Sequence, residues 1–171
     1  MALYSKVAID NAISKATKEL GYNELRPNQL AAITSFVNGR DVFVCLPTGS
    51  GKSFCYCLLP TVFDKLKACT QSSIVVVVSP LISLMKDQVR AMLERNVSAV
   101  YTGSIDDNTE ADITEGKYQL VFFSPEALLC EERWLDMLMS PLYQENLVAF
   151  VVDEAHCVKK WIQGVVVAMW L

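Results

Sequence analysis

The sequence predicts an α/β fold in which a parallel sheet is flanked by helices within a single domain. Short runs of β-branched and apolar residues alternate with helical patterns along the chain, which is typical of parallel strands joined by helices. The length of 171 residues suits one domain. A hydrophobic fraction of 52% and a mean hydropathy of +0.28 indicate strands that are buried on both faces.

Two helices are expected before the first strand. Apolar residues recur at helical spacing in the first twenty positions: Val7, Ile9, Ala12, Ile13, Ala16 and Leu20. Gly21 follows where a helix end often needs a left-handed residue. Pro27 can open the second helix and Gly39 can end it, with one apolar face made of Leu30, Ile33 and Phe36.

The strands are expected in the remainder of the chain. Four runs predict them, 41–46, 73–78, 118–123 and 147–152, and 97–101 predicts a fifth. Helical patterns over 52–59 and 81–94 lie between strands. In open parallel sheets ligands bind beyond the carboxyl ends of the strands, so polar residues there are candidates for a site. Such residues follow four of the runs, at 47–49, 79–80, 124–125 and 153–154, and should share one edge.

Charge and composition limit the function classes. A net charge of −4 and a pI of about 5.0 have the wrong sign for broad attraction to nucleic acid, so any such contact must be local. The acidic run 106–115 is interpreted as a solvated loop or helix face. No apolar run reaches the roughly 18 residues of a membrane span, and no signal peptide is recognised, so we expect an intracellular protein without a membrane partner.

The six cysteines are interpreted as reduced, buried thiols. Cys55 and Cys57 are too close together for a usual zinc site, and the sequence has no CxxC pair.

A phosphate-binding loop is predicted between a strand and a helix. The sequence LPTGSGKS, which begins at Leu46, carries glycines at 49 and 51 that let backbone N–H groups turn toward a phosphate. Lys52 is expected to reach the β and γ phosphates, and Ser53 to give its hydroxyl to Mg²⁺. The candidate ATP-binding residues of the loop are Pro47, Thr48, Gly49, Ser50, Gly51, Lys52 and Ser53. The alternative is a glycine turn before a surface lysine.

An acid pair ends the last predicted strand. The sequence VVDEAH places Asp153 and Glu154 together, and alternation along a strand should make them point differently. Asp153 is then a candidate Mg²⁺ ligand, and Glu154 a candidate to orient or deprotonate the attacking water. The candidate catalytic residues are therefore Lys52, Asp153 and Glu154, although a strand-end acid pair can also be only a helix cap. His156 could couple nucleotide state to a neighbouring domain, or have a structural role.

The motifs together resemble RecQ-type superfamily two DNA helicases. The resemblance is carried by Tyr22, LRPNQ at 25–29, LPTGSGKS, SPLISLMKDQV at 79–89 and DEAHC at 153–157, and it covers about 21–161. Leu46 stands where a strict Walker A motif has glycine, which fits the helicase variant. DEAH-box RNA helicases share the four letters, but Cys157, Val158 and Trp161 favour the RecQ pattern.

The resemblance implies a RecA-like P-loop NTPase domain that uses ATP and Mg²⁺ to unwind DNA with 3′–5′ polarity, in repair and recombination. Arg26 and Gln29 would bind adenine. The steps Ser79–Pro80 and Ser124–Pro125–Glu126 would contact the DNA backbone, either single-stranded or at a duplex junction, although helix capping alone explains both steps. Lys86 and Arg90 could likewise be a solvated helix face. In a eukaryote the location would be nuclear.

The pattern breaks after Trp161. The family continues there with a glycine and an aromatic-rich loop, whereas this chain reads IQGVVVAMWL. We expect an N-terminal helix over 1–20, an ATP-binding domain over 21–161 and a divergent tail over 162–171. A second RecA-like domain with an arginine finger would be required, so this chain alone is expected to be inactive. A truncated gene model, a retained intron, an alternative exon and a short isoform all stay open, as does a non-catalytic module that binds ATP or a partner.

Overall fold

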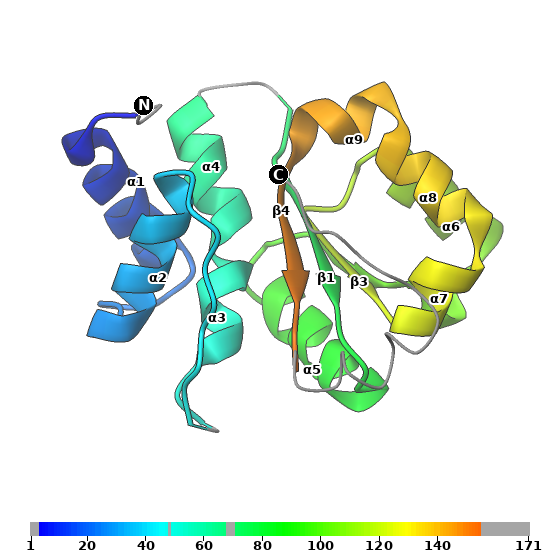
Figure 1. Ribbon diagram of the computed structural model, residues 1–171, viewed down its shortest axis with the longest axis horizontal. Helices are drawn as coiled ribbons and strands as arrows, with labels where there is room; N and C mark the ends of the chain where they lie inside the picture. The colour runs from blue at the N-terminus through cyan, green and yellow to red at the C-terminus, as the bar shows by residue number, and fades with distance from the viewer. Residues whose placement is uncertain (1–3, 48, 68–70, 155–171) are drawn as a thin grey trace. The chain divides into compact units, whose positions relative to one another are not determined.

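The computed structural model describes residues 4–47, 49–67 and 71–154. The chain divides into two compact units, residues 1–73 and residues 74–171. Figure 1 shows the elements of both units in chain order.

The first unit is helical. It contains α1 (Lys6–Glu19), α2 (Pro27–Val37), α3 (Lys52–Cys57) and α4 (Leu59–Lys67). The hydroxyl of Ser5 caps α1 by accepting a hydrogen bond from the Ala8 amide at 3.2 Å. Helix α1 packs against α4, and an ion pair between Lys65 and Glu19 joins the same two helices. The N-terminal helix is therefore an integral part of this unit.

The predicted boundaries of the first two helices are confirmed, but their apolar faces need correction. Gly21 and Gly39 follow the helices with φ of +82° and +78°, as expected of residues that end a helix. Val7 is 70% exposed and Leu30 is 42% exposed, so neither belongs to the buried face. Gln29 and Val37 occupy buried positions of α2 that the apolar pattern did not assign.

The strand predicted over 41–46 is wrong. Residues 41–47 lie outside any strand, and side chains along them alternate between exposed and half-buried. Phe43 is 82% exposed. The exposure of the side chains thus alternates with the period of a strand, but no neighbouring strand pairs with the segment among the described residues.

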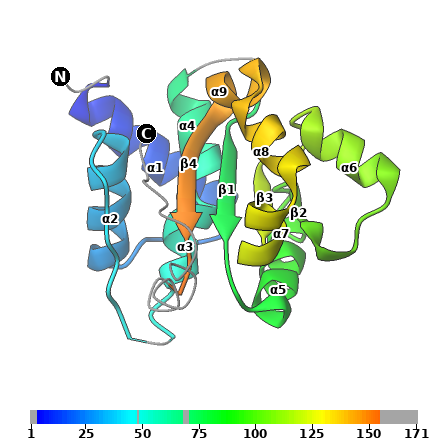
Figure 2. The ribbon, with the colours of Figure 1, turned by 45° about the vertical axis from the view of Figure 1, so that its right-hand side comes forward.

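The second unit is built on a four-stranded parallel sheet. Its strands are β1 (Ile74–Val78), β2 (Ala99–Tyr101), β3 (Leu120–Phe123) and β4 (Leu147–Val152), in the order β2-β3-β1-β4. Strand β1 is central and fully buried, and it pairs with β3 and with β4. Figure 2 shows β4, β1 and β3 side by side. The predicted strands of this unit and its parallel α/β class are confirmed.

Helices cover this sheet. They are α5 (Ile82–Leu93), α6 (Asp107–Thr114), α7 (Pro125–Cys130), α8 (Glu132–Met139) and α9 (Pro141–Asn146), with a short 3₁₀ turn η1 (Thr102–Ser104) after β2. One core joins alternate strand residues, such as Val76 and Phe123, to helices α6–α9. Trp134 and Tyr143 are its largest buried side chains, and the Tyr143 hydroxyl donates to the Ile113 carbonyl at 2.7 Å. Burial raises the pKa of this phenol.

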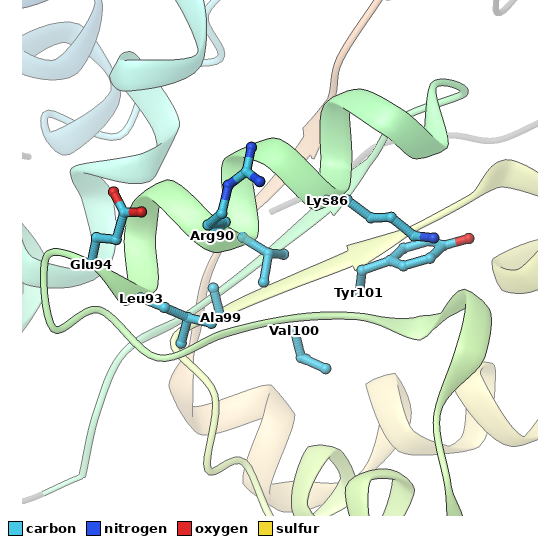
Figure 3. A pocket seen from close by; sticks show the side chains of 8 residues that line it. Lys86, Arg90, Leu93, Glu94, Ala99, Val100 and Tyr101 are labelled. Carbon is cyan, nitrogen blue, oxygen red and sulfur yellow. The ribbon is translucent and has the colours of Figure 1, made fainter.

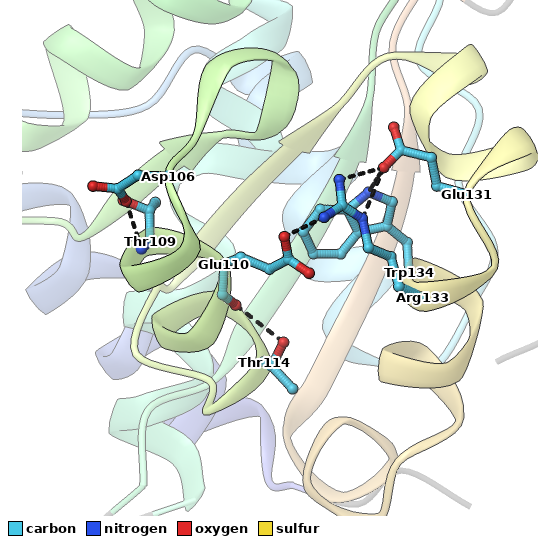
Figure 4. A network of polar contacts seen from close by, with 7 residues as sticks. All are labelled: Asp106, Thr109, Glu110, Thr114, Glu131, Arg133 and Trp134. Atoms are coloured by element: carbon cyan, nitrogen blue, oxygen red, sulfur yellow. Dashed lines mark hydrogen bonds and ion pairs between the residues drawn. The ribbon is translucent and has the colours of Figure 1, made fainter.

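A network of polar contacts lies beside Trp134 of this core (Figure 4). The Arg133 guanidinium pairs with Glu110 of α6 and with Glu131, and it lies over the Trp134 ring at 4.7 Å from the centroid. The Trp134 indole N–H donates to Glu131 at 3.1 Å. The acidic run 106–115 therefore forms α6 and its ends, and part of it binds Arg133 rather than being wholly solvated.

The cysteine prediction holds only in part. Cys55 and Cys57 are buried free thiols, and burial raises the pKa of the Cys55 thiol. Cys45 and Cys130 are also free but exposed, since one lies on the unpaired 41–47 segment and the other ends α7. Within the described ranges, no helix has both the length and the apolar character needed to cross a membrane.

Candidate functional site

The predicted phosphate loop connects the 41–47 segment to α3. Gly49 and Gly51 have φ of +78° and +79°, a left-handed conformation that favours glycine. Gly51 is the N-cap of α3. The amide and the hydroxyl of Ser50 both donate to the Pro47 carbonyl, at 3.2 and 2.6 Å. The loop is thus a tight turn that leads directly into a helix.

The Lys52 ammonium lies against its own loop. Nζ donates to the carbonyl of Leu46 at 2.9 Å and to that of Pro47 at 3.3 Å. Two carbonyl oxygens therefore hold the positive charge at the mouth of the glycine turn. A phosphate oxygen carries a full negative charge and would be a stronger acceptor for the same group.

Gln29 joins the start of α2 to the phosphate loop. Its carbonyl oxygen accepts from the Arg26 amide at 2.9 Å, and its amide nitrogen donates to the carbonyl of Gly51 at 3.0 Å. Gln29 is 7% exposed. A Cβ placed on Gly51 would lie 2.6 Å from Gln29 Nε2, so the contact requires glycine there. Two motifs that the sequence placed more than twenty positions apart are therefore in direct contact.

The aromatic residue of the upstream motif also reaches the loop helix. The rings of Tyr22 and Phe54 lie 4.2 Å apart between centroids with an interplanar angle of 47°. Phe54 is in the first turn of α3, directly after Ser53. Tyr22, Gln29 and the glycine loop thus form one contiguous cluster in the first unit.

The acid pair lies just beyond β4. The Asp153 amide donates to the Val78 carbonyl of β1 at 2.8 Å, and the Glu154 amide donates to Asp153 Oδ1 at 3.0 Å. Both acids are half-buried. Glu154 has a φ of +53°, which is uncommon for a residue other than glycine and is found at functional sites. The strand alternation expected to make the two acids point differently does not reach them, because β4 ends at Val152 and both acids lie in a turn.

The two serine–proline steps differ in structure. Ser124 caps α7 by accepting from the Ala127 amide at 3.2 Å, Pro125 occupies the first turn, and Glu126 is exposed. Ser79 does not cap a helix, since α5 begins after Leu81. The Ser79 residue is 1% exposed, and its hydroxyl has no hydrogen-bond partner among the described residues.

The parallel sheet brings three of the four predicted strand ends to one edge. Ser79, Ser124 and Asp153 follow β1, β3 and β4, which are neighbours in the sheet. The expected fourth strand end, at 47–49, belongs to the other unit and follows no strand. The candidate residues Thr48 and His156 lie outside the described residues.

The donor chemistry fits Mg²⁺. The Ser53 hydroxyl and the Asp153 carboxylate are hard oxygen ligands of the kind this ion takes. The described residues contain no group of three or more His, Cys, Asp or Glu side chains that could hold a metal by itself.

Sequence reasoning missed a groove on the second unit. It has a volume of about 410 Å³ and lies between α5 and β2, with Lys86, Arg90, Leu93 and Glu94 on its helix side (Figure 3). These four positions recur at the spacing of one helix face, and this spacing is the feature of the sequence from which the helix side of the groove could have been predicted. Lys86 and Arg90 were interpreted only as a DNA-contacting or solvated helix face.

Comparisons with known proteins agree with this arrangement of motifs. The family model described as "DEAD/DEAH box helicase" matches residues 26–170. The "ATP-dependent helicase SGS1" of Saccharomyces cerevisiae is 42% identical over 142 residues, which are 80% of this chain and 10% of that protein. The "RecQ-like DNA helicase BLM" of Xenopus laevis is 37% identical, covering 84% of this chain and 10% of that protein.

Two further comparisons extend this result. The "ATP-dependent DNA helicase RecQ" of Bacillus subtilis is 36% identical, covering 82% of this chain and 23% of that protein. A DNA-bound crystal structure of the "DUF1998 helicase MrfA" matches the fold with a TM-score of 0.60 and 20% identity, over 85% of this chain and 21% of that one. This chain thus spans about a quarter or less of these relatives. It is similar to RecQ-type helicases, and it belongs to the DEAD/DEAH box helicase family.

Proposed function

We propose that this chain is the ATP-binding motor domain of an ATP-dependent DNA helicase of RecQ type. The observation that carries the proposal is the contact of Gln29 with the Gly51 carbonyl, because it ties the motif expected to select adenine to the loop expected to bind phosphate. Similarity to curated RecQ helicases, at 36–42% identity in the three relatives named above, supports the same function.

Each residue of the site would have a distinct role. Lys52 would exchange the carbonyls of Leu46 and Pro47 for phosphate oxygens, which places its charge beside the β and γ phosphates. Ser53 and Asp153 would hold Mg²⁺, which when bound neutralises phosphate charge. Glu154 would orient the attacking water, held in place by its left-handed backbone. Gln29 and Arg26 would bind the base.

DNA is the proposed nucleic-acid partner, bound as a single strand or at a duplex junction. The α7 start at Ser124–Pro125 offers backbone N–H groups at the same sheet edge as the acid pair. A contact through backbone amides suits an acidic protein, since it needs no basic surface. The buried Ser79 hydroxyl would become available to DNA only after a local rearrangement.

Hydrolysis and 3′–5′ unwinding are proposed for the protein that contains this domain together with a second RecA-like domain. Closure of two such domains is what converts nucleotide binding into movement. His156 is proposed to couple nucleotide state to that second domain. We further propose, from the resemblance of the motifs, a division into 1–20, 21–161 and 162–171. The same resemblance supports an intracellular location, nuclear in a eukaryote, and a role in DNA repair or recombination.

A second candidate function is a module that binds ATP without turning it over. The observation that favours it is the state of Lys52, whose ammonium is already satisfied by two loop carbonyls. In that case nucleotide would bind weakly, and DNA would not stimulate hydrolysis.

Two measurements test these functions. First, titration of this chain with fluorescent ATP, with and without Mg²⁺, measures nucleotide binding, and absence of binding contradicts both candidates. Second, a chimera in which residues 1–161 replace the matching part of the Bacillus subtilis relative reports hydrolysis with and without single-stranded DNA. The intact relative is the control. We expect DNA-stimulated hydrolysis; a folded, ATP-binding chimera without it favours the non-catalytic module.

A further inference from the structure

Two serine hydroxyls, one at each end of β1, are buried without a hydrogen-bond partner among the described residues. Ser73 precedes the strand and Ser79 follows it, and the two residues are 0% and 1% exposed. A buried hydroxyl without a partner has given up its hydrogen bonds to water and replaced them with nothing, which costs free energy. Such groups are few in native proteins, and each calls for a specific explanation. Of the two, Ser79 lies at the sheet edge that carries the acid pair.

The backbone ladder places Ser79 between two candidate site residues. The Ser79 amide donates to the Phe123 carbonyl of β3 at 3.0 Å. The Asp153 amide donates to the Val78 carbonyl of β1 at 2.8 Å. Both bonds continue the parallel register by one position, so Ser79 lies opposite Ser124 on one side and Asp153 on the other. Paired strands lie about 4.8 Å apart, a separation that a hydroxyl and a carboxylate can bridge with a hydrogen bond.

Asp153 offers a better acceptor than Ser124. The Ser124 hydroxyl is neutral and already caps α7 by accepting from the Ala127 amide at 3.2 Å. The Asp153 carboxylate is charged, and hydrogen bonds to a charged acceptor are shorter and roughly twice as strong. Its Oδ1 accepts from the Glu154 amide at 3.0 Å, but a carboxylate has about four acceptor positions. The Asp153 carboxylate can therefore take the Ser79 hydroxyl as a further donor.

We propose that Ser79 is a positioning residue for Asp153, an inference that rests on the role of Asp153 in holding Mg²⁺ proposed above. The Asp153 backbone is fixed by its bond to Val78, so rotation of the side chain alone sets the direction of the carboxylate. The Ser79 hydroxyl donates to this carboxylate when it holds the ion, and the bond keeps the carboxylate in that direction. Carboxylates that bind metals are commonly hydrogen-bonded by a neighbouring group. This role differs from DNA contact, and it accounts for a hydroxyl that is buried at the sheet edge.

Binding of fluorescent ATP to this chain over a range of Mg²⁺ concentrations tests the role without measuring turnover. Ser79→Ala should raise the Mg²⁺ concentration needed for half-maximal binding about tenfold. Ser79→Cys keeps the size of the side chain but is a weak donor, so it should behave like Ser79→Ala. Because the Ser79 hydroxyl has no partner in the described part of the chain, the midpoint of urea unfolding should be unchanged or higher in Ser79→Ala.

Ser73→Ala is the matched control, because it removes the other buried hydroxyl at the opposite end of the same strand. Its Mg²⁺ dependence should equal that of the wild-type chain. Asp153→Ala removes the proposed acceptor, so adding Ser79→Ala to it should change the Mg²⁺ dependence no further.

Several outcomes would overturn the positioning role. They are an unchanged Mg²⁺ dependence in Ser79→Ala, an equal change in Ser73→Ala, and a full additional effect of Ser79→Ala in the Asp153→Ala background. Weaker binding of single-stranded DNA by Ser79→Ala, with unchanged Mg²⁺ dependence, would assign the hydroxyl to DNA instead. A wild-type chain whose ATP binding does not respond to Mg²⁺ would contradict the proposed function itself, and the positioning role with it.

Discussion

The segment 41–46 and strand β4 have the same kind of sequence but different structures. Each is a short β-branched and apolar run that leads into candidate functional residues. Strand β4 pairs with β1 from Ile74↔Leu147 to Val78↔Val152, and this ladder continues into the Asp153 amide. Residues 41–46 have no strand partner among the described residues, and Phe43 is 82% exposed.

The difference teaches how each of the two groups of candidate residues, the phosphate loop and the acid pair, is held within its own unit. The acid pair is positioned by backbone bonds to a buried central strand. The phosphate loop is positioned by side chains, since Gln29 and Lys52 both donate to its carbonyls. A β-branched and apolar run shows that a segment can pair, but only a neighbouring strand makes it a strand. We therefore expect changes in the phosphate loop and changes in the acid pair to have separable effects.

The largest effect should distinguish binding from hydrolysis. Lys52→Ala removes the charge proposed to bind phosphate, so ATP affinity of this chain should fall about 10–100-fold. Glu154→Gln removes only the proposed base, so affinity should stay within about threefold while DNA-stimulated hydrolysis of the chimera falls about 100-fold or more. Fluorescent-ATP titration and phosphate release measure the two quantities. Unchanged turnover in either variant contradicts the assigned roles.

A large loss of stability is expected from a change in the core of the second unit, which contains the parallel sheet. Trp134 is buried against Phe123 with ring centroids 5.2 Å apart, so Trp134→Ala should lower the free energy of unfolding by about 3–5 kcal/mol. Leu135→Ala, one position along the same helix, is the control because Leu135 is 45% exposed. It should cost less than about 1 kcal/mol. Urea unfolding monitored by circular dichroism, a signal that does not depend on tryptophan, compares the two variants. Equal losses of stability would contradict the burial of Trp134 in this core.

A smaller effect, on ATP affinity, is expected from changes at the two glycines of the phosphate loop. Gly49→Ala and Gly51→Ala both force a side chain into a left-handed conformation, but only the second also meets Gln29 Nε2 at 2.6 Å. Gly51→Ala should therefore weaken ATP binding about tenfold and Gly49→Ala about threefold. Adding Gln29→Ala to each variant measures the coupling by titration. Coupling confined to Gly51 supports the contact, and equal coupling at both glycines contradicts it.

The smallest effect concerns pH. Burial raises the folded-state pKa of Tyr143 above its unfolded value of about 10, so this group's contribution is fully present below that pH. The contribution is lost as pH rises further, because the unfolded chain ionises first. Tyr143→Phe should cost about 1 kcal/mol at neutral pH and reduce the loss of stability above pH 10. Urea unfolding from pH 8 to 11 checks this; identical slopes in the two proteins would refute it.

The sequence by itself determined most of the elements and where the candidate motifs lie in them. The strands over 74–78 and 147–152, the left-handed glycines 49 and 51, and the acid pair after β4 were all predictable. They depend on interactions between residues close in the chain, such as apolar periodicity and the steric freedom of glycine. The family resemblance followed from the same short motifs.

The tertiary structure decided what depends on distant partners. It left 41–46 without a strand partner in the described part of the chain, buried the Ser79 hydroxyl and brought Gln29 into contact with Gly51. It also made Trp134 and Tyr143, which no strand pattern contains, the largest side chains of the core. The physical reason is that pairing and burial are properties of two surfaces in contact, and a local pattern describes only one of them.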